Sequence, residues 1–183
     1  MLTIGDRFPS FRLSAVEGGP RGLDPRTAFT TLSDADDAGR WKLIFFWPKD
    51  FSLLCPTEIL GFARLAPEFE ARNTILYGVS LDSELVHMHW RLHHRELRDL
   101  PFAMLSDVRR DLSRECGILD PVEGIPLRAT FLIDPEGVIR HVSVHDLAVG
   151  RNPQETLRVL DALLTGELCG CNWQKGEETL KLR

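Results

Sequence analysis

The chain has 183 residues, of which 43% are hydrophobic and 27% charged, and its formal net charge is −5. A chain of this length and composition is expected to form a globular domain that buries about 70% of its unfolded surface. No cluster of lysine and arginine could follow a phosphate backbone, so nucleic acid is not an expected partner. No apolar stretch approaches the roughly 20 residues of a membrane span, and no signal peptide is apparent. We therefore expect no membrane association and a cytosolic location.

The predicted elements begin with irregular chain. Residues 14–40 are rich in Gly, Pro, Asp and Thr and show little periodicity, which indicates a connecting segment. Leu43–Trp47 is apolar at every position, which is typical of a strand covered on both faces. Pro56 fits the first position of a helix. Pro67 lies inside the same pattern and should break it, so we predict two helical runs with a distortion between them.

Strands and helices continue to alternate in the middle of the chain. Thr74–Leu81 has the composition of a second buried strand. A helix is predicted from Ser83 to about Arg98, capped by Asp82 or by Ser83 itself. Another is predicted from Ser106 to Cys116, with Gly117 as a suitable stop.

The last elements are a hairpin and a helix. Arg128–Asp134 and Val138–Val144 flank a short Pro- and Gly-containing turn, and Pro153–Thr165 is amphipathic. The order β-α-β-α, hairpin, helix predicts an α/β fold with a central mixed sheet flanked by helices, which is compatible with a thioredoxin-like fold. We expect one domain over residues 1–166 and a polar tail over residues 167–183.

The four cysteines are too few for a disulfide framework. Cys55 is the most informative of them, because it lies between a buried strand and a helix N-terminus. The free N–H groups and positive dipole end of a helix favour a thiolate, so this is where a redox nucleophile is expected. Cys116 falls on the apolar face of its predicted helix and is expected in the core. Cys169 and Cys171 lie in the tail.

Several motifs in order resemble one family. The pattern P-x-x-x-[T/S]-x-x-C is met by Pro48, Ser52 and Cys55, and P-T-E follows at once. The chain is thereby similar to the peroxiredoxins, of the typical two-cysteine alkyl hydroperoxide reductase C type in an actinobacterial-like form, from about residue 2 to 176. The other motifs that carry the resemblance are Asp82-Ser83 with His87 and Trp90, the strand Arg128–Pro135, and the tail Leu168-Cys169-Gly170-Cys171-Asn172-Trp173.

The resemblance implies a thiol-dependent peroxidase that uses neither metal nor cofactor. Cys55 would reduce hydrogen peroxide or an organic hydroperoxide and become a sulfenic acid, and Cys169 would resolve it as a disulfide. A dithiol protein would restore both thiols, either a thioredoxin, a flavoprotein or an alkylhydroperoxidase D-like adaptor. In this family the resolving cysteine comes from the partner subunit, which implies a homodimer and often a decameric ring of five dimers. The sequence by itself leaves open whether the disulfide forms within one chain or between two.

The resemblance also assigns roles around Cys55. Arg128 is expected to hold the thiol ionised and to polarise the peroxide. The hydroxyl of Ser52 would bond the incoming oxygen, and the ring of Pro48 would wall off the pocket. Glu58 either orients Arg128 or is a solvated carboxylate in the first turn of the helix.

Some alternatives stay open at this point. Cys171 departs from the common tail and is either a relay or substitute for Cys169, or an accessory thiol; a C-x-C zinc half-site lacks a second half. His89 and His93 stand four residues apart and could bind a metal, although surface or dimer contacts are the simpler interpretation. The same fold could instead serve as a peroxide-sensing relay or a holdase chaperone. A thiol–disulfide oxidoreductase is disfavoured because C-x-x-C is missing.

Overall fold

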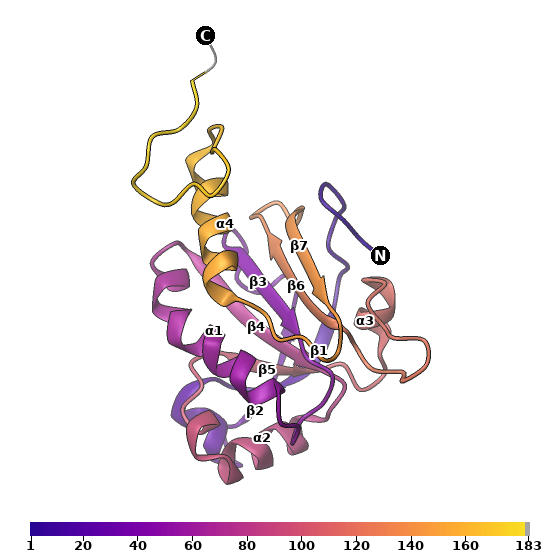
Figure 1. Cartoon of the computed structure of the whole chain (residues 1–183). Helices are drawn as coiled ribbons and strands as arrows, with labels where there is room; N and C mark the ends of the chain where they lie inside the picture. The colour runs from indigo at the N-terminus through magenta and orange to yellow at the C-terminus, as the bar shows by residue number, and fades with distance from the viewer. Residues whose placement is uncertain (182–183) are drawn as a thin grey trace.

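Seven strands form one mixed sheet in the computed structural model, which describes residues 1–181 (Figure 1). Their order across the sheet is β2-β1-β5-β4-β3-β6-β7. At the centre, β3 pairs in parallel with β4 and antiparallel with β6. The predicted α/β class with a central mixed sheet is confirmed. The strands are β1 Arg12–Val16, β2 Phe29–Ser33, β3 Trp41–Phe46, β4 Thr74–Ser80, β5 Ala103–Ser106, β6 Arg128–Ile133 and β7 Ile139–His145.

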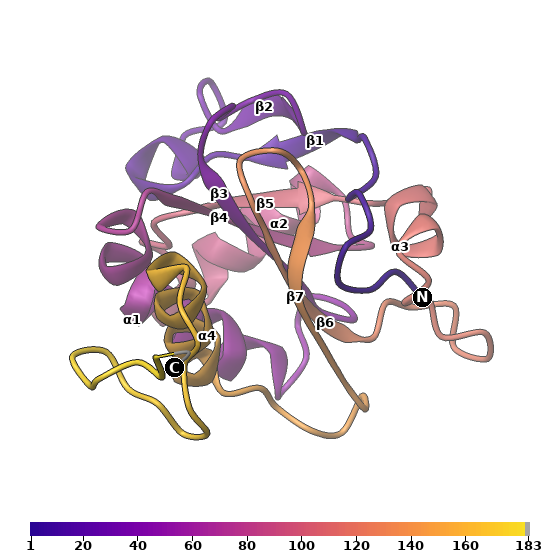
Figure 2. The same cartoon turned by 90° about the horizontal axis from the view of Figure 1, so that it is seen from above.

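Helices cover both faces of this sheet. Figure 2 shows α1 and α4 together on one side and α3 on the other. No helix of residues 1–181 is both long and apolar enough to cross a membrane. The helices are α1 Cys55–Glu70, α2 Glu84–His93, α3 Asp111–Glu115 and α4 Pro153–Thr165, with the 3₁₀ turns η1 Gly19–Leu23 and η2 Arg95–Leu97.

The central strand β3 is buried on both faces, as its apolar run predicts. Phe45 belongs to the cluster under α1, α2 and α4, whereas Ile44 and Phe46 belong to the cluster under α3. The Phe45 ring stacks on Phe62 of α1 with 4.3 Å between ring centroids. Because β3 is held from both sides, the loop that leaves it toward Cys55 starts from a fixed point.

The interpretation of residues 14–40 as irregular chain is wrong. They contain part of β1 and all of β2, which pair antiparallel with each other at one end of the sheet. Neither strand carries a strong apolar pattern in its sequence. In the structure, β2 has no fully buried residue. β1 is held mainly by its partners, including the pairing of Ala15 with Leu105 of β5. Tertiary pairing thus creates strands where local propensity is weak.

Pro67 does not divide α1 into two runs. The helix continues from Cys55 to Glu70, with Pro67 inside it. Since the proline lies in the last turn, its missing N–H leaves only the carbonyl of Ala63 without the usual helical partner. A break so close to the end of a helix costs little, and packing of the apolar face against β3 and β4 maintains the helix.

The two predicted middle helices are shorter than expected. α2 is capped by Ser83, whose hydroxyl accepts from the N–H of Val86, but it ends at His93 rather than near Arg98. Ser106, the predicted start of the next helix, instead belongs to β5. Strand β5 pairs with both β4 and β1, and this pairing outweighs the local helix-start signal.

The C-terminal predictions are confirmed. β6 and β7 form the antiparallel hairpin, and α4 spans Pro153–Thr165 as predicted. The side chain of Asn152 accepts from the N–H of Gln154 at the start of α4, and Gly166 ends it with φ of 65°. The following residues fold back, so that Leu168 bridges Leu180.

The stacked ring of Phe62 should be a principal source of stability. We expect Phe62→Ala to lower the free energy of unfolding by about 3–5 kcal/mol, because it leaves a cavity between α1 and β3. Urea unfolding monitored by circular dichroism measures the loss. The matched control is Leu53→Ala, whose side chain is 97% exposed, and it should change stability by less than about 0.5 kcal/mol. Equal effects of the two substitutions would contradict this assignment.

Candidate active site

Cys55 is the first residue of α1 and is fully buried. The chain reaches it from β3 through the loop of residues 47–54, and Pro56 takes an early helical position. The backbone N–H of Cys55 donates to the hydroxyl oxygen of Ser52, 3.3 Å away. The thiol therefore lies at a helix N-terminus, as predicted, where backbone N–H groups favour negative charge.

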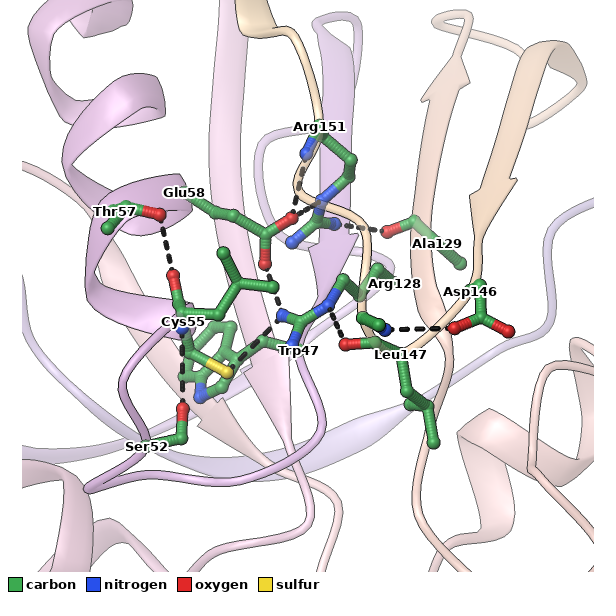
Figure 3. A network of polar contacts seen from close by, with 12 residues as sticks. Trp47, Ser52, Cys55, Thr57, Glu58, Arg128, Ala129, Asp146, Leu147 and Arg151 are labelled. Carbon is green, nitrogen blue, oxygen red and sulfur yellow. Dashed lines mark hydrogen bonds and ion pairs between the residues drawn. The ribbon is translucent and has the colours of Figure 1, made fainter.

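Arg128 comes to this thiol from the hairpin. It is the first residue of β6, and its Nη1 lies 3.4 Å from the Cys55 sulfur (Figure 3). Its Nε donates to the carbonyl of Leu147, 2.8 Å away, which fixes the plane of the guanidinium. Burial by itself lowers the pKa of Arg128, but the hydrogen bond to Cys55 and the charge of Glu58 outweigh burial and raise it. The guanidinium is therefore a permanent cation beside the sulfur.

Glu58 joins Arg128 to a second arginine. One turn after Cys55, its Oε2 accepts from Arg128 Nη1 at 2.5 Å and its Oε1 from Arg151 Nε at 2.8 Å. Figure 3 shows the carboxylate between the two guanidinium groups. Glu58 is only 3% exposed. Of the two alternatives for Glu58, orientation of Arg128 is therefore supported and the solvated carboxylate is wrong.

Arg151 is the residue that the sequence analysis missed. Its side chain is buried, its Nη1 donates to the carbonyl of Ala129 at 2.8 Å, and its guanidinium lies 5.5 Å from the ring centroids of Phe45 and Phe62. Burial lowers its pKa, and the charge of Glu58 opposes that change. Its position just before the Asn152 cap gave no local signal. A buried carboxylate needs hydrogen-bond donors for both oxygens, and Arg128 can serve only one oxygen of Glu58 here. The need for a second donor was the available clue to Arg151.

The charges of this cluster balance only with an ionised sulfur. Arg128 and Arg151 contribute two positive charges, and Glu58 contributes one negative charge. The salt bridges found within residues 1–181 include no second carboxylate for either arginine. A thiolate at Cys55 would make the buried cluster neutral, which lowers the cost of burying its charges.

The other predicted residues differ in how close they come to the thiol. Ser52 contacts the backbone of Cys55 through its hydroxyl oxygen. Pro48 is buried two residues after the end of β3, at the start of the loop that carries the thiol.

Cys169 and Cys171 lie at the opposite end of α4 from the site. The sulfur of Cys169 is 3.4 Å from the hydroxyl of Thr165 and 3.8 Å from the carbonyl of Ala162, in the last turns of the helix. Cys171 is exposed, and all four cysteines are free thiols. α4 has 13 residues, which span about 20 Å, and Arg151 at its start touches the active site. The fold therefore does not bring the tail thiols to Cys55 within one chain (Figure 1).

Cys116 lies in the core, and His89 and His93 lie on the surface. Cys116 is fully buried in the apolar cluster beneath α3, as predicted, and burial raises the pKa of its thiol. A ring nitrogen of His93 lies 2.8 Å from the carbonyl oxygen of His89, and both histidines are exposed. Within residues 1–181, no group of three or more His, Cys, Asp or Glu side chains is arranged to hold a metal ion.

Comparison with known proteins agrees with this geometry. The model of the AhpC/TSA family matches residues 4–142. The chain is 48% identical to alkyl hydroperoxide reductase C of Mycobacterium tuberculosis, over 98% of this chain and 94% of the relative. It is 38% identical to peroxiredoxin-2 of Bos taurus, over 97% of this chain and 89% of the relative.

Solved structures give the same result. Mycobacterium bovis AhpC has a TM-score of 0.87 at 48% identity, covering 95% of this chain and 99% of that one. The reduced 2-Cys peroxiredoxin of Plasmodium vivax has a TM-score of 0.89 at 31% identity, covering 99% of this chain and 94% of that one. The predicted thioredoxin-like fold is thus confirmed.

The fold and the similarity to named peroxide reductases define a thiol-dependent peroxidase. The chain belongs to the AhpC/TSA family, as a peroxiredoxin of the alkyl hydroperoxide reductase C type. The predicted family and its enzymatic activity, reduction of peroxides by a thiol, are confirmed.

Removing the carboxylate between the two arginines should destabilise the protein. We expect Glu58→Gln to lower the free energy of unfolding by about 3–5 kcal/mol, because two buried guanidinium groups lose their counter-charge. The matched control is Glu155→Gln, which breaks the more exposed pair with Arg158 and should cost under about 1 kcal/mol. Urea unfolding of both variants compares them, and similar losses would contradict the assigned importance of Glu58.

The four thiols should differ in their reaction with iodoacetamide. In the reduced native protein at pH 8, we expect exposed Cys171 to be labelled first. Cys116 should be labelled only after unfolding in urea, because burial both raises its pKa and excludes the reagent. Mass spectrometry of the labelled peptides over time gives the order. Labelling of Cys116 in the native protein as fast as that of Cys171 would refute this order.

Proposed function

We propose that Cys55 is the thiol that attacks the peroxide and that Arg128 is its catalytic partner. The observation that carries this proposal is the 3.4 Å contact between Arg128 Nη1 and the sulfur, in a cluster with one unbalanced positive charge. The contact favours the thiolate, which is the reactive form. It also places a donor beside the position where an attacked oxygen would lie.

The reaction then proceeds by displacement at oxygen. The thiolate of Cys55 attacks the terminal oxygen of the hydroperoxide, so that a sulfur–oxygen bond forms as the oxygen–oxygen bond breaks. The sulfur is oxidised to a sulfenic acid. The other oxygen leaves with the bonding electron pair, is stabilised by Arg128, takes up a proton and departs as an alcohol, or as water when the substrate is hydrogen peroxide.

Ser52 and Pro48 complete the proposed substrate pocket. The hydroxyl oxygen of Ser52 accepts from the N–H of Cys55, so its own hydrogen is free to donate to the peroxide. Pro48 offers a rigid ring and no backbone N–H, and its burial at the start of the loop suits it to excluding water.

Cys169 is proposed as the resolving thiol, supplied by the partner subunit of a homodimer. Its sulfur attacks the sulfenic sulfur of Cys55, a disulfide forms, and water leaves. The length of α4 supports a partner's tail, because the tail of the same chain lies at the far end of that helix. The edge strand β7 offers unpaired backbone groups through which two subunits could join their sheets. Assembly of dimers into a decameric ring belongs to the same proposal.

A dithiol protein is proposed to reduce the disulfide, whether a thioredoxin, a flavoprotein or an alkylhydroperoxidase D-like adaptor. Exposed Cys171 is placed to pass the disulfide to it, since it lies two residues from half-buried Cys169. In this proposal residues 1–166 form the catalytic domain and residues 167–183 the tail that carries the exchange, within the cytosol.

Cysteine variants test these roles. We expect Cys55→Ser to abolish peroxide consumption with a dithiol reductant, because Cys55 is the thiol that contacts the guanidinium of Arg128. Cys169→Ser should permit one turnover and then stall, because the sulfenic acid is not resolved. The measurement is peroxide loss over time, followed by non-reducing mass spectrometry after one equivalent of peroxide to identify the linked peptides.

Cys116→Ser is the matched control and should leave turnover unchanged, since Cys116 lies in the apolar core. The proposal fails if Cys55→Ser retains the wild-type rate. The role of Cys169 fails if the disulfide joins Cys55 to another thiol, and the homodimer fails if the linked cysteines belong to one chain.

A further inference from the structure

A second group of buried polar side chains, formed by Asp50 and His87, lies at the loop that carries the thiol. Residues 47–54 join β3 to α1, and Asp50 of this loop is almost completely buried. Facing it from α2 is His87, which is fully buried, with its Nδ1 2.7 Å from Asp50 Oδ2. The peroxidase steps described above use neither side chain.

The contacts of His87 determine where its protons lie. Nε2 is 3.2 Å from the carbonyl oxygen of Leu105, which can only accept, so Nε2 carries a hydrogen. A second proton must lie between Nδ1 and the carboxyl group of Asp50. Asp50 and His87 therefore share this proton in a buried hydrogen bond.

One other charged group faces this pair, Asp82 in the turn before α2. Its Oδ2 accepts from the backbone N–H of Asp50 at 2.7 Å. Burial raises the pKa of Asp82, the negative charge of Asp50 acts in the same direction, and the charge of His87 opposes both. The salt bridges found in residues 1–181 give Asp50 no partner besides His87. His87 and Trp47 therefore give both oxygens of the buried Asp50 carboxyl group a hydrogen-bond partner.

Asp50 is fastened at three points. Its Oδ1 accepts from Trp47 Nε1 at 2.8 Å, its Oδ2 pairs with His87, and its N–H donates to Asp82. Two of these three partners come from outside the loop. Asp50 consequently ties the middle of the loop to α2 and to the turn before it.

The contacts of Asp50 also hold the residues that connect it to Cys55. Phe51 has φ of 54°, a left-handed conformation that is unfavourable for a non-glycine residue and so needs support from its neighbours. Its ring lies 5.9 Å from that of Trp90 on α2. Ser52 then accepts from the N–H of Cys55. The place of Cys55 at the start of α1 therefore depends on the loop being held against α2.

We propose that Asp50 and His87 are positioning residues for the peroxidase reaction, whose hydrogen bond keeps the Cys55 sulfur aligned with Arg128. This inference rests on the proposed role of Cys55. Losing the pair should slow attack on the peroxide, because a displacement of about 1 Å can cost about 100-fold in rate.

Three variants test the proposal, with the rate constant for hydrogen peroxide measured by stopped-flow tryptophan fluorescence. His87→Ala removes the fastening and should lower the rate by about 100-fold. Asp50→Asn should keep a rate close to wild type, because an amide can accept from Trp47 and donate to a neutral His87. The matched control, His89→Ala, changes an exposed histidine on the same helix and should have no effect.

Two further measurements separate positioning from general damage. In His87→Ala, iodoacetamide should label Cys55 faster than in wild type while the peroxide reaction becomes slower, because the loosened loop exposes the thiol but misaligns it. In Asp50→Asn, iodoacetamide should label Cys55 at the wild-type rate, because the amide keeps the hydrogen bonds that hold the loop.

A wild-type peroxide rate in His87→Ala would overturn the proposal, and so would a large loss of rate in Asp50→Asn. If His87→Ala does not fold, Asp50→Ala carries the test: a rate about 100-fold below that of Asp50→Asn supports the proposal, and equal rates overturn it. Failure of the proposed function is distinguishable, because Cys55→Ser would then still consume peroxide whatever the His87 variants do.

Discussion

One unbalanced positive charge organises the catalytic end of this molecule. Arg128 and Arg151 share the single carboxylate of Glu58, and all three side chains are buried. Buried charge is costly unless it is paired, so the cluster is most favourable when the sulfur of Cys55 is negative. The proposed peroxidase chemistry follows from that constraint, because the positive charge that lies beside the sulfur is also available to the departing oxygen.

The parts of this cluster come from segments that are distant in sequence. Cys55 and Glu58 belong to the first turn of α1, Arg128 begins β6, and Arg151 precedes α4. The hairpin and α1 meet because β3 lies between β4 and β6 in the sheet. The fold thus fixes the cations before any substrate arrives, which is the preorganisation that electrostatic catalysis requires.

Burial of the thiol also divides the catalytic cycle into two demands. In the proposed cycle, attack on peroxide needs Cys55 held beside Arg128, whereas disulfide formation needs it to meet a second thiol that lies beyond the length of α4. Asp50 and His87 form buried polar contacts that hold the loop of Cys55 in the first arrangement. Phe51 in the same loop has a left-handed backbone conformation that depends on this support.

The sequence determined whatever depends on neighbouring residues. The apolar run of β3, the Asn152 and Gly166 ends of α4, the hairpin turn and the thiol at a helix start are all local patterns. The spaced motif around Cys55 also identified the family. Only the tertiary structure decided what depends on distant partners: strands β1 and β2 exist because β5 pairs with β1, and Ser106 is strand because Ser80 of β4 pairs with it. Arg151 and the pairing of Asp50 with His87 belong to the same class, since the compensation of a buried charge is set by distance in space, which no local pattern encodes.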